Sequence, residues 1–370
     1  MKKVVFLVRS LDYGGAQRQV VTLVTALSKK KFDVTVACFY SGQPLEKDLK
    51  NSNVRMVSLN KGGRWDLFGF WATLLSEIGS LQPNIIHGYL GVPNILTIFL
   101  KPFFPSCRMV WGLRNSQMDL KRYDWLRQLS VELESLLSRF ADLIIVNSHA
   151  GLADLIKKGF PGQKMIVIPN GIDTERFKPD PESRLGFRAE WGISPNTVLI
   201  GLVARLDPMK DHKTFLRAAA LLTPTREDVR FICVGNGSEE YAKELDRLAD
   251  ALGIGDRVVW TGAIANMPAV YNALDIATSA SSYGEGFSNA IGEAMACGVP
   301  CVVTDVGDSA LIVGDTGFVV RPETPEALLE AWLSCLNRDR NELGGQARER
   351  ILEKFTISHL VSASEEALEF

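Results

Sequence analysis

The 370-residue sequence predicts an α/β protein made of two tandem, doubly wound Rossmann-like domains. Short apolar segments of strand length alternate with amphipathic segments of helix length, which is typical of parallel sheets covered by helices. The alternation occurs twice, before and after a segment at 169–195 that is rich in proline, glycine and charge and that we expect to connect the domains. The length also exceeds what one ordinary hydrophobic core accommodates.

The elements follow one another in each half. In the first half we expect helices at 16–27 and 122–139 and strands at 4–8, 32–39, 84–87, 107–111, 143–146 and 165–168. In the second half we expect helices at 213–222, 239–252 and 289–297 and strands at 197–203, 229–234, 257–261, 275–278 and 300–304. A final amphipathic helix covers 358–368. Doubly wound sheets bind ligands beyond the carboxyl ends of their strands, so the residues after each strand are the functional candidates.

Composition argues against several classes of protein. The six cysteines form no CxxC pair and several lie inside apolar strands, so we expect buried, reduced thiols and no zinc site. The apolar run at 4–8 is too short for a signal peptide and lacks a cleavage site. The run at 95–104 is interrupted by Lys101 and Pro102 and cannot span a bilayer. We therefore expect a cytoplasmic protein.

The charge is unevenly distributed. Residues 1–170 contain 22 Lys and Arg against 12 Asp and Glu, whereas residues 171–370 contain 19 against 31. Such asymmetry favours an anionic partner for the first half, either a membrane surface or a phosphate-bearing acceptor. Variation in surface charge, with attraction between the halves, explains it equally well.

Glycines and cations follow several strands. Gly14 and Gly15 open the first helix, where backbone amides and the helix N-terminus could bind a phosphate, although a tight turn is an equal explanation. The second strand ends without the acidic residue that would hold the ribose of a nicotinamide cofactor, which argues against a dehydrogenase. Arg205 and Lys210 could neutralise a diphosphate, but alone they would be a solvated basic loop. Gly235 begins another glycine-rich turn before a helix. For the next residue, Asn236, a turn that binds no ligand is the simpler explanation.

The most informative stretch runs from residue 283 to residue 300. Glu285 lies in a loop after a strand, and the amides of Gly286, Phe287 and Ser288 at the following helix start could bind an anion. Glu293 lies about two turns into that helix, where it could accept hydrogen bonds from a ribose diol. Two surface carboxylates would explain the spacing alone, but the surrounding glycine frame makes this instance more specific.

These motifs resemble the retaining, GT-B-fold glycosyltransferases of family 4. The matching residues are Arg205 and Lys210 and the segments 169–173, 285–296 and 300–305, and the resemblance covers nearly the whole chain. It implies an acceptor-binding domain at 1–178, completed by a helix at 356–370, and a donor-binding domain at 190–355. It implies an enzyme that moves a sugar from a nucleotide-diphosphate donor, expected to be UDP-linked, to a lipid-linked or polysaccharide acceptor.

The resemblance also assigns roles. Arg205 and Lys210 would grip the diphosphate, Glu293 the ribose, and Glu285 would lie near the donor sugar beside the amides of 286–288. Gly15 would approach the phosphate from the other domain, and Gly235 would contribute to the donor site. No metal or cofactor is expected, because the Asp-x-Asp metal motif is absent and the two cations would replace it. No nucleic-acid partner is expected.

One position departs from the family pattern. Arg114 stands where the family often has a histidine, and His87, after the preceding expected strand, could substitute in part, although a structural histidine is the commoner case. We therefore name His87 and Arg114 as catalytic candidates along with Glu285, Arg205 and Lys210. A nucleotide-sugar epimerase, a non-catalytic nucleotide-sugar sensor and a structural partner in envelope assembly remain alternatives.

Aromatic and basic residues also suggest peripheral binding to the inner face of the membrane. Phe103 and Phe104 would lie at the apolar boundary, while Lys121, Arg122 and Arg127 would contact anionic lipid. A solvated basic face is the alternative. For Trp111, inside an expected strand, a place in the core is preferred.

Overall fold

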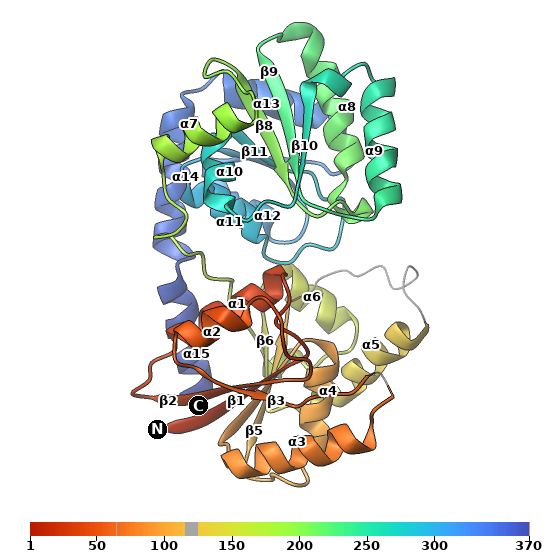
Figure 1. Cartoon of the computed structure of the whole chain (residues 1–370), viewed down its shortest axis with the longest axis vertical. Coiled ribbons are helices and arrows are strands. Elements are labelled where there is room, and N and C mark those ends of the chain that lie inside the picture. Colours follow the sequence, from red (N-terminus) through yellow and green to blue (C-terminus); the bar gives the residue numbers. More distant parts are fainter. Residues whose placement is uncertain (64, 115–124, 370) are drawn as a thin grey trace. The chain divides into compact units, whose positions relative to one another are not determined.

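The structure, a computed structural model, describes residues 1–63, 65–114 and 125–369. It divides into two compact units (Figure 1): Met1–Gly171 with Ile357–Phe370, and Ile172–Thr356. Each contains one sheet whose strands pair in parallel, with helices on both faces. The predicted α/β fold class with two doubly wound sheets is therefore confirmed.

The first unit has a seven-stranded sheet in the order β3-β2-β1-β4-β5-β6-β7. Its strands are β1 (Lys2–Val8), β2 (Phe32–Cys38), β3 (Arg55–Ser58), β4 (Ile85–Tyr89), β5 (Arg108–Leu113), β6 (Leu143–Val146) and β7 (Met165–Val167). Its helices are α1 (Gly15–Ala26), α2 (Glu46–Asn51), α3 (Phe68–Leu81), α4 (Gly91–Leu100), α5 (Trp125–Leu137), α6 (His149–Lys157) and α15 (Ile357–Glu369).

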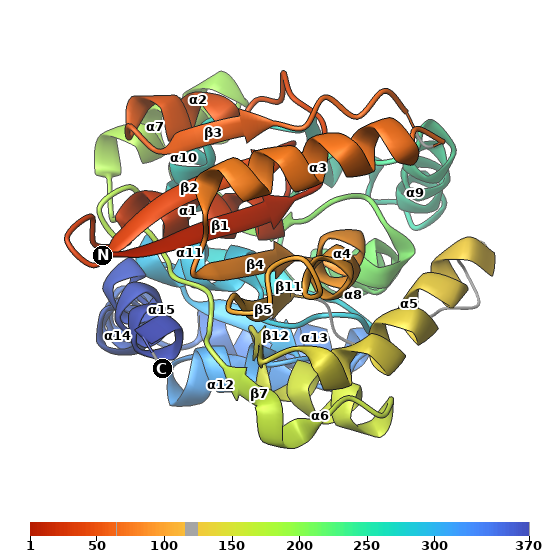
Figure 2. The same ribbon diagram turned by 90° about the horizontal axis from the view of Figure 1, so that it is seen from below.

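Strand β1 illustrates why an unbroken apolar run forms the centre of this sheet. Val4 and Phe6 pack on one face with apolar residues of α1 and α15. Val5 and Leu7 pack on the other face with apolar residues of α3, which crosses the sheet in Figure 2. Successive side chains of a strand point to opposite faces, so a strand covered on both faces is apolar throughout.

The second unit has a six-stranded sheet in the order β10-β9-β8-β11-β12-β13. Its strands are β8 (Val198–Val203), β9 (Val229–Val234), β10 (Val258–Gly262), β11 (Ile276–Ser279), β12 (Cys301–Thr304) and β13 (Phe318–Val320). Its helices are α7 (Pro181–Glu190), α8 (His212–Leu222), α9 (Glu239–Ala251), α10 (Met267–Ala273), α11 (Asn289–Ala296), α12 (Ser309–Val313), α13 (Pro325–Leu336) and α14 (Arg340–Lys354).

The segment predicted as an interdomain connection is largely part of the second unit. The side chain of Asp180 accepts a hydrogen bond from the Ser183 amide (3.0 Å) and so begins α7. Two arginines of α7 turn inward, because Arg184 and the buried Arg188 both pair with Asp275 (2.8 and 2.6 Å). The units divide at 171/172 and 356/357, rather than at the expected limits near 178, 190 and 355.

Both sheets reverse their strand order at one point, between β1 and β4 and between β8 and β11. Ligands of doubly wound sheets bind beyond the carboxyl ends of the strands at this switch point. Val8 pairs with Tyr89 at the first switch point, and Leu202 pairs with Thr278 at the second. The residues that follow these pairs therefore define the two regions where a site is expected.

Two further expectations concern the cysteines and the membrane. All six cysteines are free and buried, as predicted. In the described part of the chain, no helix is both long enough and apolar enough to cross a bilayer.

Candidate active site

The basic loop of the second unit begins where β8 ends and is held by two aspartates. Asp207 accepts a hydrogen bond from the Met209 amide (3.0 Å). Asp211, with a φ of 47°, accepts one from the Thr214 amide (3.1 Å) and caps the N-terminus of α8. These two caps fix the backbone on both sides of Lys210.

Lys210 forms an ion pair with Glu285, which lies in the loop between β11 and α11. Glu285 is buried, with 7% of the residue exposed, and its carboxylate also accepts a hydrogen bond from the Ser281 hydroxyl (2.6 Å). The two loops are joined by a hydrogen bond from the Ser282 amide to the Met209 carbonyl (2.9 Å). Because a buried carboxylate requires a compensating charge, the pair holds both groups in place at the second switch point.

Arg205 lies on the same loop but has a different partner. Its guanidinium is about two-thirds exposed and donates to Asp207 (2.7 Å). Burial raises the pKa of Asp207, but hydrogen bonds from the Met209 amide and Arg205, with the charges of Arg205 and Lys210, bring that pKa below its ordinary value. Each of the two predicted phosphate-binding cations is therefore paired with its own carboxylate.

Helix α11 and the residues just before it include three more of the predicted donor-binding residues. Ser288 precedes its first residue and makes no side-chain capping bond, and Phe287 packs on Phe355 with ring centroids 5.2 Å apart. Glu293 accepts a hydrogen bond from the Tyr271 hydroxyl (2.9 Å). Burial, and then the charge of Glu293, raises the pKa of Tyr271 well above its ordinary value. One oxygen of the predicted ribose-binding carboxylate is thus already engaged.

The predicted glycines lie in loops or at the start of a helix. Gly15 is the first residue of α1, and the Gly286 carbonyl accepts a hydrogen bond from the Asp308 amide (3.1 Å). Gly235 has a φ of 146°, and a Cβ atom there would lie 2.1 Å from the Ala204 carbonyl oxygen. Their donor-binding roles remain predictions.

His87 does not lie where the sequence placed it. It lies in the middle of β4 rather than at the end of a strand, is 1% exposed, and its ring lies 4.7 Å from the ring of Phe6. Among the described residues, neither ring nitrogen has a hydrogen-bond partner. Burial, and then the charge of Arg114, lowers the pKa of His87 to about 3. The expected strand ended at residue 87, but β4 continues to Tyr89 and encloses a neutral imidazole, which fits the structural role given above as the commoner case.

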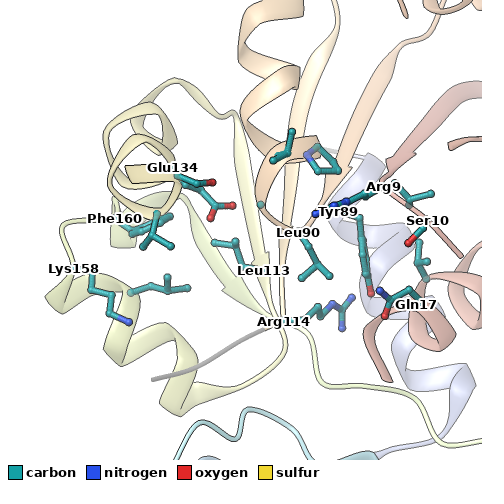
Figure 3. Close-up of a pocket in the computed structure, with 18 residues that line it drawn as sticks. Arg9, Ser10, Gln17, Tyr89, Leu90, Leu113, Arg114, Glu134, Lys158 and Phe160 are labelled. Atoms are coloured by element: carbon teal, nitrogen blue, oxygen red, sulfur yellow. The ribbon is translucent and has the colours of Figure 1, made fainter. Parts of the chain in front are cut away.

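Arg114 follows β5 directly and borders a pocket of about 250 Å³ in the first unit (Figure 3). Arg9, Gln17, Tyr89 and Glu134 also line this pocket. Arg9 and Tyr89 lie at the ends of β1 and β4, so the pocket occupies the first switch point. Of these residues, only Arg114 was named as a candidate from the sequence. Arg9 and Tyr89 could have been recognised from their positions near the ends of the first and fourth strands.

The second unit has a much smaller cavity beside Lys210. It measures about 30 Å³ and is also lined by Ser281 and Ser288. A nucleotide needs several times this volume, so a donor would have to bind on an open face of this unit. Within the described residues, no three or more His, Cys, Asp or Glu side chains form a group that could hold a metal ion.

Sequence comparisons find relatives for both halves. A profile described as Glycosyl transferases group 1 matches residues 197–338, and one described as Glycosyltransferase Family 4 matches residues 13–176. The lipopolysaccharide core biosynthesis mannosyltransferase LpsB of Rhizobium meliloti (strain 1021) is 33% identical over 172 residues, 45% of this chain and 48% of that protein. The GDP-mannose-dependent alpha-(1-6)-phosphatidylinositol monomannoside mannosyltransferase of Mycolicibacterium smegmatis is 33% identical over 181 residues, 46% and 47% of the two chains. The chain thus spans about half the length of these curated relatives.

A solved structure extends the likeness to the entire chain. The crystal structure of Anabaena Alr3699/HepE in complex with UDP-glucose has a TM-score of 0.85, covers 100% of both chains and is 23% identical, which shows a shared fold. One profile matches within each half of the chain, and together they cover most of it. The chain therefore belongs to the group 1 glycosyltransferases and has their GT-B fold.

Proposed function

We propose that this protein transfers a sugar from a nucleotide-diphosphate donor to a lipid-linked or polysaccharide acceptor, without a metal and with retention of anomeric configuration. The observation that carries the proposal is the Lys210–Glu285 ion pair at the second switch point, with Arg205 on the same loop. Family membership supports glycosyl transfer, and the resemblance to retaining enzymes supports retention.

The chemistry follows from where charge develops. When the bond between the anomeric carbon and the diphosphate breaks, negative charge grows on the phosphate, and preorganised cations and helix-terminal amides stabilise it. Lys210 and the first amides of α11 would supply this stabilisation. The exposed Arg205–Asp207 pair is weak, so a diphosphate can replace Asp207 as the partner of Arg205. The acceptor oxygen forms the new bond on the same face, and its proton passes to the leaving phosphate.

The donor is expected to be UDP-linked. The structural neighbour bound to UDP-glucose supports this choice, whereas one of the curated relatives depends on GDP-mannose by its name. The two cations would bind the diphosphate of either donor, so the base has to be determined by experiment.

Peripheral binding to the inner face of the membrane is part of the proposal. Of the residues named above for membrane binding, Phe103 is exposed and Phe104 packs partly against the core. Trp111 is fully buried, as predicted. Lys121, Arg122 and the side chain of Arg127 lie outside the described residues. Two aromatic residues before and in α3 strengthen the case, because Trp65 is 80% exposed and Phe68 is 93% exposed. The names of the relatives, which refer to lipopolysaccharide and phosphatidylinositol, are consistent with an acceptor at a membrane.

The proposal is tested by incubating the purified protein with UDP-glucose, UDP-galactose, UDP-N-acetylglucosamine and GDP-mannose. We expect one donor to raise the melting temperature and to be hydrolysed slowly, with the released sugar first appearing as the anomer present in the donor. An inverted anomer would contradict retention, and formation of an epimer without sugar release would indicate an epimerase. If none of the four donors binds at millimolar concentration, the proposed activity is wrong.

A further inference from the structure

The pocket of the first unit contains a buried cation whose hydrogen-bonding capacity is only partly used. Arg114 is 7% exposed, and one of its terminal nitrogens donates to the Asn170 side-chain oxygen (2.8 Å). Its Nε has no partner among the described residues, and the hydrogen bond to Asn170 engages a neutral amide. A buried guanidinium with a neutral partner and an unused donor is unfavourable unless a ligand supplies the missing anion.

Tyr89 adds a second unused group at the same place. Its ring lies 5.2 Å below the Arg114 guanidinium, its side chain is 3% exposed, and its hydroxyl has no partner among the described residues. Figure 3 shows this hydroxyl directed toward Gln17 and Arg114. Buried tyrosine hydroxyls usually find a hydrogen-bond partner, so this one also indicates that a ligand group belongs here.

The other charged groups of the pocket are distributed asymmetrically. Arg9 is exposed at the end of β1, whereas Lys158 is already paired with Asp154 (2.6 Å). Glu134 is buried and accepts a hydrogen bond from the side-chain amide of Asn94 (2.8 Å). Figure 3 places Glu134, with Lys158 on the same side, beyond Leu113 from Arg114, so this carboxylate lies away from the Arg114 guanidinium.

The size of the pocket limits what it can hold. At about 250 Å³ it lies below the roughly 300–1,000 Å³ of sites for drug-sized ligands, so it suits a single sugar ring. Leu90, Leu113 and Phe160 form apolar parts of its wall, against which the carbon face of a ring can pack.

We propose that this pocket binds one sugar ring of the acceptor and that the ring carries an anionic substituent, either a phosphate or a carboxylate. Arg114 and the Tyr89 hydroxyl bind the anion, while Glu134 accepts hydrogen bonds from ring hydroxyls. The inference rests on the proposed function, because it defines the acceptor of that reaction.

The test measures binding by calorimetry with UDP present at saturation, so that the phosphate-binding loop of the second unit is occupied. The probes are glucose, glucose 1-phosphate, glucose 6-phosphate and glucuronate at fixed ionic strength. We expect at least one anionic sugar to bind about 10-fold or more tightly than glucose, in line with charge-assisted hydrogen bonds. Preference for the phosphates or for glucuronate identifies the substituent.

Three variants link the preference to the pocket. Arg114→Gln should reduce the preference for the anionic sugar to near one, and Tyr89→Phe, which keeps the ring, should reduce it several-fold. Glu134→Gln should weaken the binding of all the sugars without changing the preference. Lys47→Gln, which removes an exposed cation from the first unit, is the matched control and should change nothing. Circular dichroism checks folding, and Tyr89→Phe remains decisive if Arg114→Gln does not fold.

The two proposals fail in different ways. If UDP itself does not bind, the proposed function is contradicted. If UDP binds but glucose and the anionic sugars bind equally well, or if Tyr89→Phe and Arg114→Gln keep the preference, the inference about the acceptor is wrong.

Discussion

Removing the Lys210 ammonium should destabilise the second unit as well as impair catalysis. In Lys210→Met the methionine keeps much of the aliphatic side chain, but Glu285 loses its only described ion-pair partner. The Glu285 side chain is 9% exposed and that of Lys210 is 20% exposed, so the carboxylate would remain largely buried, with the Ser281 hydroxyl as its only hydrogen-bond donor among the described side chains. Breaking a fully buried pair costs about 3–5 kcal/mol, and the partial access of water reduces our expectation to about 2 kcal/mol.

The change is measured as a shift in melting temperature at pH 7.5. For a unit of this size, about 2 kcal/mol corresponds to a decrease of about 4–8 °C. The matched control is Lys213→Met, because Lys213 forms a more exposed pair with Glu244 whose loss should cost about 0.5 kcal/mol or less. The double variant Lys210→Met/Glu285→Gln removes both charges and should recover at least half of the lost stability.

Two results would refute this reasoning. One is a melting temperature of Lys210→Met equal to that of Lys213→Met, which would mean that water or another cation compensates Glu285. The other is a double variant no more stable than Lys210→Met, which would mean that the lost contact is packing rather than charge.

Four further outcomes are expected. Arg205→Ala should lower turnover by about 100-fold or more while leaving the melting temperature unchanged, because the side chain is exposed; normal turnover would exclude Arg205 from the phosphate site. Activity should persist in excess EDTA, and a loss that magnesium or manganese restores would contradict the metal-free reaction. The protein should co-sediment with anionic vesicles at low salt, and the double variant Trp65→Ser/Phe68→Ser should bind them several-fold less tightly; equal binding by both would exclude this surface. Finally, His87 has a pKa of about 3 when folded against 6.5 when unfolded, so protonation favours the unfolded chain and stability falls as pH decreases from 6.5 toward 3. Between pH 7 and 5 this histidine alone should lower the free energy of unfolding by about 2 kcal/mol. The free energy of unfolding of His87→Leu, measured in urea, should therefore fall by about 2 kcal/mol less over the same pH range.

The predictability of the fold depended on burial. Central strands such as β1 and β9 were recognised because both of their faces are covered, which makes them apolar throughout. The edge strands β3 and β13 were missed, because their residues are mostly half-exposed and carry no continuous apolar run. Helix α7 was mistaken for a connection because its prolines and charges are typical of linkers. Only the tertiary structure shows that Arg188 turns inward to Asp275.

The candidate site was predictable where it depended on local motifs. Lys210 and Glu285 were recognised from their own loops, and the structure brings them into contact. The pocket of the first unit was not predicted, because it depends on the sheet order that places β1 beside β4. No local pattern shows that Tyr89 and a glutamate from the last turn of α5 will line the same cavity as Arg114.

A glycine near the site can be required either by ligand binding or by close packing of one loop on the backbone of another. Gly235 was predicted from its position after a strand to bind the donor, yet its φ of 146° and the Ala204 carbonyl, 2.1 Å from any Cβ, already require glycine. Gly307 has a φ of 63°, and a Cβ there would lie 2.5 Å from the Glu285 carbonyl oxygen. Both glycines let one loop pack directly on the backbone of another loop that carries a predicted phosphate-binding or catalytic residue. Their first effect on catalysis is therefore to set the positions of Arg205 and Glu285, and an alanine at either place should disturb the site even if no ligand contacts it.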